Sequence, residues 1–495
     1  MKSNPCDGSI SSSEGSFWNS IKSLEGLFII CGMILFLVKV YQNRFPMTDF
    51  KVYYDAARHF LNSDNLYNPS LFYRFKYPPC SPAFFTPFLL LPFWLTKVPA
   101  FLTILISFAL ILRTLSYWTN QETRGWLGVV FLMAWAGLVQ FEIHLGQVTF
   151  FELLLLLWMF EYIETEQNWK AGLLYAVSLH LKPFGWTIAL WGAVRGKYRF
   201  LMHSAIFFVI LCFVPMLFYG FSGTISLWQG FFTEMMDLEK QNLSLFALGN
   251  NSISSIFFRW TGLSGMLSES NAKYIGSLIN LAVLIIPLML LFKKDNSGNA
   301  RLEGIWILAI IPVIGPSDQK YFFLTLPLAW VAINRFRELP RSAKILIVLG
   351  LTCIGFNIYD LWGKKISHWL TDISITGVGG FFIYLSGYYT SLKESEKKLS
   401  YAPGIVNLFN IREIRIFAIV IFLFLVPTIY FKAINRNSGF ICLKCHEIMI
   451  QGNRHHGIKS LEGRPICKSC GSANIISLDE YEKMNDLSSK TVPAL

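Results

Sequence analysis

Asp49 is the residue of this sequence with the strongest case for chemistry. It follows the first long apolar segment and opens the stretch Asp49-Phe50-Lys51-Val52-Tyr53-Tyr54-Asp55-Ala56-Ala57, and Tyr77-Pro78-Pro79 comes a loop later. A carboxylate at a membrane surface can take a proton from a hydroxyl group while a lipid-linked substrate lies beside it. An acid at the start of a helix can instead accept backbone N–H bonds as a cap. The sequence leaves both roles open.

Two pairs of cysteines near the C-terminus have the spacing of a metal site. They are Cys442-Leu443-Lys444-Cys445 and Cys467-Lys468-Ser469-Cys470. Two C-x-x-C pairs separated by a spacer of roughly twenty residues can present four thiolates in a tetrahedron, which predicts structural zinc in a small ribbon over 440–475. Two disulfides are the alternative, favoured if this ribbon lies on the outer, oxidising side of a membrane.

The composition places the chain among polytopic membrane proteins. Of its 495 residues, 53% are hydrophobic and only 15% are charged, and the mean hydropathy is +0.45. The net charge of +12 would suggest nucleic acid in a soluble protein. Here Lys and Arg fall in short loops between apolar runs, so the charge indicates membrane orientation and not a nucleic-acid partner.

Since about 20 apolar residues are needed to cross a bilayer, the apolar runs predict roughly 11–13 transmembrane helices. The first run, 24–41, lacks a small-residue cleavage site and is expected to be retained. The segment 170–194 is interrupted by Lys182-Pro183 and is either one kinked helix or two halves of a re-entrant hairpin. The Pro-punctuated segment 81–95 is expected to lie at the interface. Basic loops, including those of Arg195 and Arg301, are placed in the cytoplasm, which puts four segments outside: 42–97, 141–147, 221–272 and 317–320.

Several stretches resemble a known family, in the order expected for it. The first-loop motifs are D-F-x-V-Y-Y-x-A-A from Asp49, Leu66-Tyr67, and Phe75-Lys76-Tyr77-Pro78-Pro79; the later ones are Gly146-Gln147-Val148, Lys182-Pro183, and Asn250-Asn251-Ser252-Ile253 leading to Arg259. Together they are similar to the polyprenol-phosphate-mannose-dependent mannosyltransferases of the GT-C superfamily of multi-span glycosyltransferases. The resemblance covers roughly residues 46–335.

This resemblance implies an inverting transfer at a single active site on the outer side of the membrane. The donor would be a sugar on a polyprenyl monophosphate, and the acceptor a lipid or a lipid-linked glycan. The acid of the family's first-loop motif maps onto Asp49, which would deprotonate the acceptor hydroxyl as its oxygen attacks the anomeric carbon. The leaving phosphate ester carries negative charge, so cationic side chains are expected near it.

Three cations are candidates for the phosphate side. Lys182 interrupts an apolar segment, where an ammonium group needs a cavity or an anion unless it snorkels to the interface. Arg259 could bind phosphate through two N–H donors, and Lys320 lies in a tight link between two spans; both could equally be interfacial anchors. The other predicted substrate-binding residues are Gln147, Asn250, Tyr53 and Tyr77. Most aromatic residues of the first loop could as easily form an interfacial belt.

One stretch departs from the family pattern. Where members often carry histidines, this chain has Asp318-Gln319-Lys320. The departure leaves the donor contact and the identity of the sugar open. Glu142 and His144, beside Gly146-Gln147, are expected to solvate a short turn or to assist acceptor binding.

The sequence therefore predicts an all-α polytopic integral membrane protein, a GT-C-like bundle with interfacial helices in the first outer loop and a small C-terminal zinc ribbon. The predicted segments are a cytoplasmic tail 1–23, a transferase domain 24–434 with outer loops 46–97 and 221–272, the ribbon 440–475, and a flexible tail 476–495. The predicted function is transfer of a hexose, expected to be mannose, from polyprenyl phosphate to an outer-leaflet lipid or glycan in the plasma membrane. Asp49 is the predicted base, zinc is structural, no catalytic metal is expected, and the ribbon could dock a protein partner.

Two other classes of protein remain compatible with the sequence. A flippase or transporter of lipid-linked sugar would use the same cavity and cations without needing Asp49 for bond formation. A non-catalytic membrane scaffold would survive loss of Asp49 but would fail without Cys442 or Cys467.

Overall fold

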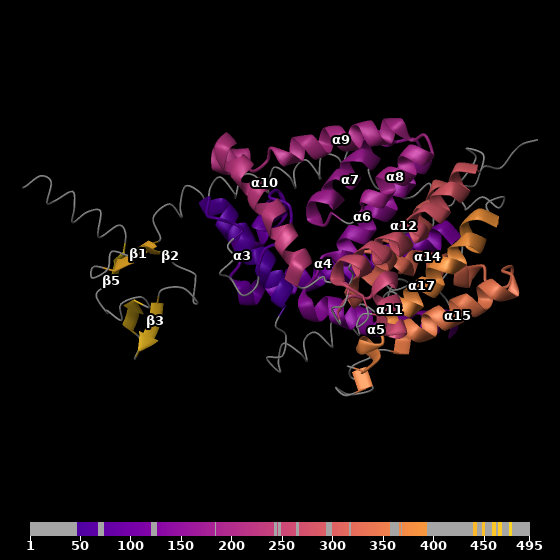
Figure 1. The fold of residues 1–495 in the computed structure, drawn as a ribbon. Coiled ribbons are helices and arrows are strands. Elements are labelled where there is room, and N and C mark those ends of the chain that lie inside the picture. The colour runs from indigo at the N-terminus through magenta and orange to yellow at the C-terminus, as the bar shows by residue number, and fades with distance from the viewer. Residues whose placement is uncertain are drawn as a thin grey trace, which may run out of the picture. The chain divides into compact units, whose positions relative to one another are not determined.

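The computed structural model shows a large helical unit and a small set of strands (Figure 1). The chain divides into two compact units, residues 1–60 with 65–417 and residues 61–64 with 418–495, and each is described by itself. The residues that the structure describes are 47–67, 74–119, 126–183, 185–241, 245, 249–263, 267–293, 299–315, 318–356, 366–367, 369–393, and five strands between 439 and 477. The predicted span 24–41 lies outside them.

The first unit is helical throughout its regular elements, as the sequence predicts. Its elements are α3 (Thr48–Asn62), η2 (Ser81–Leu90), α4 (Phe93–Thr119), α5 (Trp126–Leu145), α6 (Thr149–Glu164), α7 (Asn168–Leu181), α8 (Trp186–Val194), α9 (Tyr198–Cys212), α10 (Met216–Gln241), α11 (Ile253–Thr261), α12 (Glu269–Lys293), α13 (Ala300–Ile314), η4 (Gln319–Thr325), α14 (Leu326–Asn334), α15 (Arg341–Phe356), α17 (Ile375–Gly387) and η5 (Tyr388–Lys393).

The centre of the bundle is built on α6 and α13. Every residue of α13 is buried, and its sequence is apolar around most of the helix, the pattern of a helix with neighbours on all sides. By contrast, α9, α10 and α12 expose large apolar side chains, among them Ile206, Phe221 and Ile286. Apolar faces without protein cover are suited to contact with lipid.

By length and composition, two described helices could cross a membrane: Phe93–Thr119 and Ser270–Phe292. Two bent pairs could each form one further span, Ala134–Leu145 with Thr149–Glu164 and Tyr198–Cys212 with Met216–Met236, at angles of 115° and 97°. The count of roughly 11–13 spans therefore stays a prediction.

Two predicted segments take a more specific form in the structure. The stretch 170–194 is not one kinked helix but two helices, α7 and α8, and Lys182 between them has extended backbone (φ −148°, ψ 121°). The Pro-punctuated 81–95 begins as the 3₁₀ helix η2, and the long helix after it starts at Phe93, within this segment.

Buried ion pairs connect the central helices. The Arg301 Nε lies 2.8 Å from Glu161 Oε2, and Arg195 forms a two-point pair with Glu303, Nε–Oε2 and Nη2–Oε1 both at 2.9 Å. These side chains are almost completely buried. A buried charge is strongly destabilising without its partner, so the pairs fix α13 against α6 and against the end of α8. Arg195 and Arg301 thus stabilise the bundle through these ion pairs, in addition to the topological role that the sequence suggests for basic residues of loops.

The second unit contains five short antiparallel strands, β1 (Gly439–Cys442), β2 (Ile448–Ile450), β3 (Ile458–Leu461), β4 (Arg464–Cys467) and β5 (Ile475–Ser477). They form a three-stranded sheet, in the order β2-β1-β5, and a β3-β4 hairpin. The first cysteine of each C-x-x-C pair, Cys442 or Cys467, is the last residue of a strand. Cys445 and Cys470 lie outside the described residues, so the zinc site stays a prediction.

Candidate active site

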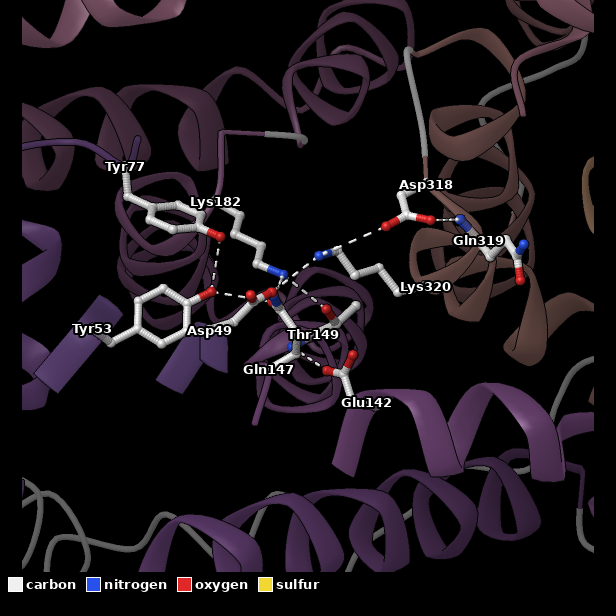
Figure 2. A network of polar contacts seen from close by, with 10 residues as sticks. All are labelled: Asp49, Tyr53, Tyr77, Glu142, Gln147, Thr149, Lys182, Asp318, Gln319 and Lys320. Carbon is white, nitrogen blue, oxygen red and sulfur yellow. Dashed lines mark hydrogen bonds and ion pairs between the residues drawn. The ribbon is translucent and has the colours of Figure 1, made fainter. Parts of the chain in front are cut away.

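Asp49 lies in the first turn of α3, with its carboxylate turned toward two other elements (Figure 2). Its Oδ2 accepts hydrogen bonds from Gln147 Nε2 and, at 3.1 Å, from Lys320 Nζ. The side chain is 27% exposed. Within the described part of the chain, no donor contacts Oδ1 and no backbone N–H of α3 caps the carboxylate. The structure therefore favours a role at a site over the helix-capping alternative.

Gln147 occupies the sharp break between α5 and α6. Its Oε1 accepts a hydrogen bond from Lys182 Nζ at 2.7 Å and lies 3.1 Å from the Tyr53 hydroxyl. Lys182 also donates to Thr149 Oγ1 at 2.8 Å, and it is completely buried. The break thus brings the predicted lysine and the predicted acid to opposite ends of one amide group, as Figure 2 shows.

Glu142 shapes the same break. Its Oε1 accepts the backbone N–H groups of Thr149, at 2.6 Å, and Phe150, at 3.3 Å, which are the first two residues of α6. Free N–H groups and the helix dipole favour a negative charge at this end. Glu142 therefore caps α6 across the turn, a more specific role than the solvation of a turn expected from the sequence.

Gly146 allows this turn to pack on the start of α3. Its φ is +68°, and a Cβ added there would lie 2.6 Å from Phe50 Cβ and 3.1 Å from Met47 Cγ. Only glycine adopts this backbone without strain while leaving that space to its neighbours. The close approach brings Gln147 against Asp49, 98 positions earlier in the chain.

Gly146→Ala is expected to reduce catalytic turnover by about 10²-fold, because the added methyl group displaces α3 and with it the carboxylate. Gly262→Ala is the matched control: Gly262 has the same φ of +68° but nothing within 4 Å of an added Cβ. The control should lose only about 1–2 kcal/mol of stability, the cost of holding alanine in a left-handed backbone conformation. Rates and thermal unfolding of both variants check this; equal losses of rate would contradict the packing argument.

The two predicted tyrosines lie beside Gln147. Their hydroxyl oxygens are 2.9 Å apart, and the Tyr53 ring stacks on Phe85 with ring centroids 4.6 Å apart. Burial, with the neighbouring hydroxyl next in size, raises the pKa of Tyr53 well above its ordinary value, and burial likewise raises the pKa of Tyr77. Both hydroxyls therefore stay neutral, and Tyr53 belongs to this buried network, not to a lipid-facing belt.

Lys320 is the cation nearest to Asp49 with access to solvent. Its side chain is 12% exposed, and its ammonium group also lies 3.9 Å from Asp318 Oδ2. Burial opposes the charge, but the carboxylate of Asp49, with Tyr77 and Asp318, outweighs burial and raises the pKa of Lys320. The neighbouring Gln319 donates to Thr371 Oγ1 at 2.8 Å, which anchors this link to the segment before α17. The geometry is that of a carboxylate held beside a permanent positive charge.

Residues 75–316 match the family model of glycosyltransferase family 87. No curated protein matches the chain. The chain is a glycosyltransferase, and with its apolar helices it is an integral membrane protein whose substrates are expected to be a lipid-linked sugar and an acceptor in the membrane. The match contains Gln147 and Lys182, whereas Asp49 and Lys320 lie outside it and join them only through the fold.

The glycosyltransferase holds the other two predicted site residues in a second cluster. Arg259 donates to the carbonyl oxygens of Asp372, at 2.9 Å, and Asn250, at 3.1 Å, and also to Ser374 Oγ. Asn250 Oδ1 accepts the N–H of Ser252, the residue that caps α11. These contacts tie α11 to the turn before α17. The structure thus brings together Asp49, Tyr53, Tyr77, Gln147, Lys182 and Lys320, whereas the contacts given above for Asn250 and Arg259 are with α11 and the turn before α17.

Thr149, which accepts from Lys182, and Thr371, which accepts from Gln319, contact the candidate site and were missed by sequence reasoning. Thr149 could have been found, because it stands directly after Gly146-Gln147-Val148 at a predicted helix start. Thr371 carries no local signal. Within the described residues no group of three or more His, Cys, Asp or Glu side chains could hold a metal ion.

Proposed function

We propose that the protein is an inverting hexosyltransferase. Its donor would be polyprenyl-phosphate mannose, and its acceptor a lipid or a lipid-linked glycan. The reaction would take place at the outer face of a multi-pass protein of the plasma membrane. The observation that carries the proposal is the Asp49 carboxylate: Oδ2 is held by Gln147 and Lys320, and no donor among the described residues contacts Oδ1, which could accept a proton. The first-loop resemblance supports the choice of donor.

The proposed step balances without a further reactant. The acceptor hydroxyl gives its proton to Asp49 Oδ1 as its oxygen forms a bond to the anomeric carbon. The bond from that carbon to the phosphate oxygen breaks, and the electron pair leaves with polyprenyl phosphate. Lys320, the solvent-accessible cation beside the carboxylate, would stabilise the developing negative charge. Attack opposite to the leaving group inverts the anomeric configuration.

The test uses the full chain in liposomes of host lipid, with labelled polyprenyl-phosphate mannose as donor. Label is expected to enter a new lipid or glycan product, and labelled nucleotide-linked mannose should give none. Label that crosses the bilayer on an unchanged donor would overturn the proposal in favour of a transporter. Product from polyprenyl-phosphate glucose alone would keep the reaction and correct the sugar.

We also propose that residues 440–475 form a structural zinc ribbon through Cys442, Cys445, Cys467 and Cys470, available to a protein partner. The arrangement of the described strands supports this, because one cysteine of each C-x-x-C pair ends a strand of an antiparallel pair. Metal analysis of the purified chain decides between one zinc per chain and the alternative of two disulfides.

A further inference from the structure

Gln147 stands between the proposed base and a buried cation. Its Nε2 donates to Asp49 Oδ2, while its Oε1 accepts from Lys182 Nζ at 2.7 Å. An ammonium group can only donate and an ionised carboxylate can only accept, so the two partners fix which end of the amide faces which. Figure 2 shows this alignment of lysine, amide and carboxylate.

Burial separates this pair from the substrate side of the site. Gln147 is 1% exposed and Lys182 is 0% exposed, whereas the Asp49 side chain is 27% exposed. Lys182 is held from two sides, by Gln147 Oε1 and by Thr149 Oγ1. A charge in this position acts on the carboxylate through space and can also polarise the amide, which strengthens the hydrogen bond from Nε2 to the carboxylate.

We infer that Gln147 is the positioning residue of Asp49, and that Lys182 acts on the base through Gln147 and not by touching the sugar donor. The inference rests on the proposed function and revises the substrate-binding roles that the sequence suggested for both side chains. Holding Oδ2 on the buried side leaves Oδ1 directed to the acceptor. Without the amide the carboxylate could rotate, and without the lysine the amide could turn over.

A double-mutant cycle tests the inference. Gln147→Met and Lys182→Met are each expected to lower kcat by about 10²-fold, with the KM for the donor unchanged. The double variant should be no slower than either single one, because both changes break one chain of contacts. Additive losses, about 10⁴-fold in the double variant, would overturn the inference. So would a rise in donor KM at constant kcat, the result expected of a direct donor contact.

The chain supplies a matched control and a second variant. Lys170 Nζ donates to Gln167 Oε1 at 2.6 Å, a lysine–glutamine pair at the start of α7. Gln167→Met with Lys170→Met should leave kcat unchanged. If Gln147→Met fails to fold, Gln147→Glu decides: it keeps the size and the acceptor for Lys182, but its ionised carboxylate cannot donate to Asp49. A Gln147→Glu variant with the wild-type rate would overturn the inference.

The failure of the inference and that of the proposed function are distinguishable. An active Asp49→Asn variant would remove the proposed base whatever the cycle shows. An inactive Asp49→Asn variant with additive effects at Gln147 and Lys182 would remove the inference alone.

Discussion

Asp49→Asn should lower the rate of sugar transfer by about 10²–10⁴-fold, the usual contribution of a general base. Asparagine has nearly the same size and can still contact Gln147 and Lys320, but its amide cannot take the acceptor's proton. The measurement is the initial rate of label transfer in liposomes at equal protein level. Thermal unfolding of the variant should stay close to that of the wild type.

Asp55→Asn is the matched control for this prediction. Asp55 lies on the same helix and forms exposed ion pairs with Lys51, at 2.6 Å, and Arg58, at 3.2 Å. Exposed pairs of this kind contribute about 0–1 kcal/mol, so the control should fold and transfer sugar normally. Equal rates for wild type and Asp49→Asn, or equal losses in both variants, would remove Asp49 from the chemistry.

The sequence could identify the main side chains of the site but not how they meet. Lys182 stood out because a charge in an apolar run is costly without a function or a partner. Asp49 stood out as an acid at the membrane surface, and Lys320 as a cation in a tight link between two spans. Their convergence depends on contacts between positions 98 and 271 residues apart, made possible by the packing of Gly146 on α3. Arg259 stood out as a possible phosphate ligand, yet it donates to the carbonyl oxygen of Asp372 and the hydroxyl of Ser374 in another loop. Charge alone does not distinguish these cases.

For the fold, too, local features could be predicted from the sequence, whereas contacts between distant positions could not. Apolar runs predict the helical class well, because burial of apolar surface depends on local composition. The break between α7 and α8 was expected from Lys182-Pro183, although the choice between a kinked helix and two helices was not decided by the sequence. The buried ion pair of Arg195 with Glu303 could not be predicted from the sequence, since the partners are 108 positions apart.

Lys320→Met should lower kcat/KM for the donor by about 10²–10³-fold, the typical loss when one charge-stabilising donor is removed from an active site. The ammonium group lies 3.1 Å from Asp49 Oδ2, and the Lys320 side chain is 12% exposed. Lys51→Met is the matched control, because Lys51 is 49% exposed and pairs with Asp55. A Lys320→Met variant with the control's rate would exclude a role in stabilising the leaving phosphate.

The pH profile of activity distinguishes a lysine at position 320 from a histidine. Because the pKa of Lys320 is raised above its ordinary value, the protonated form persists as the pH rises, and this group should cause no loss of rate below about pH 10. A histidine has an ordinary pKa of about 6.5 and loses its charge as the pH rises through that range. Lys320→His should therefore transfer sugar best at low pH and lose activity toward neutrality, whereas Lys320→Arg should keep the wild-type profile. A Lys320→His variant as active at pH 8 as the wild type would show that a permanent positive charge at this position is not required.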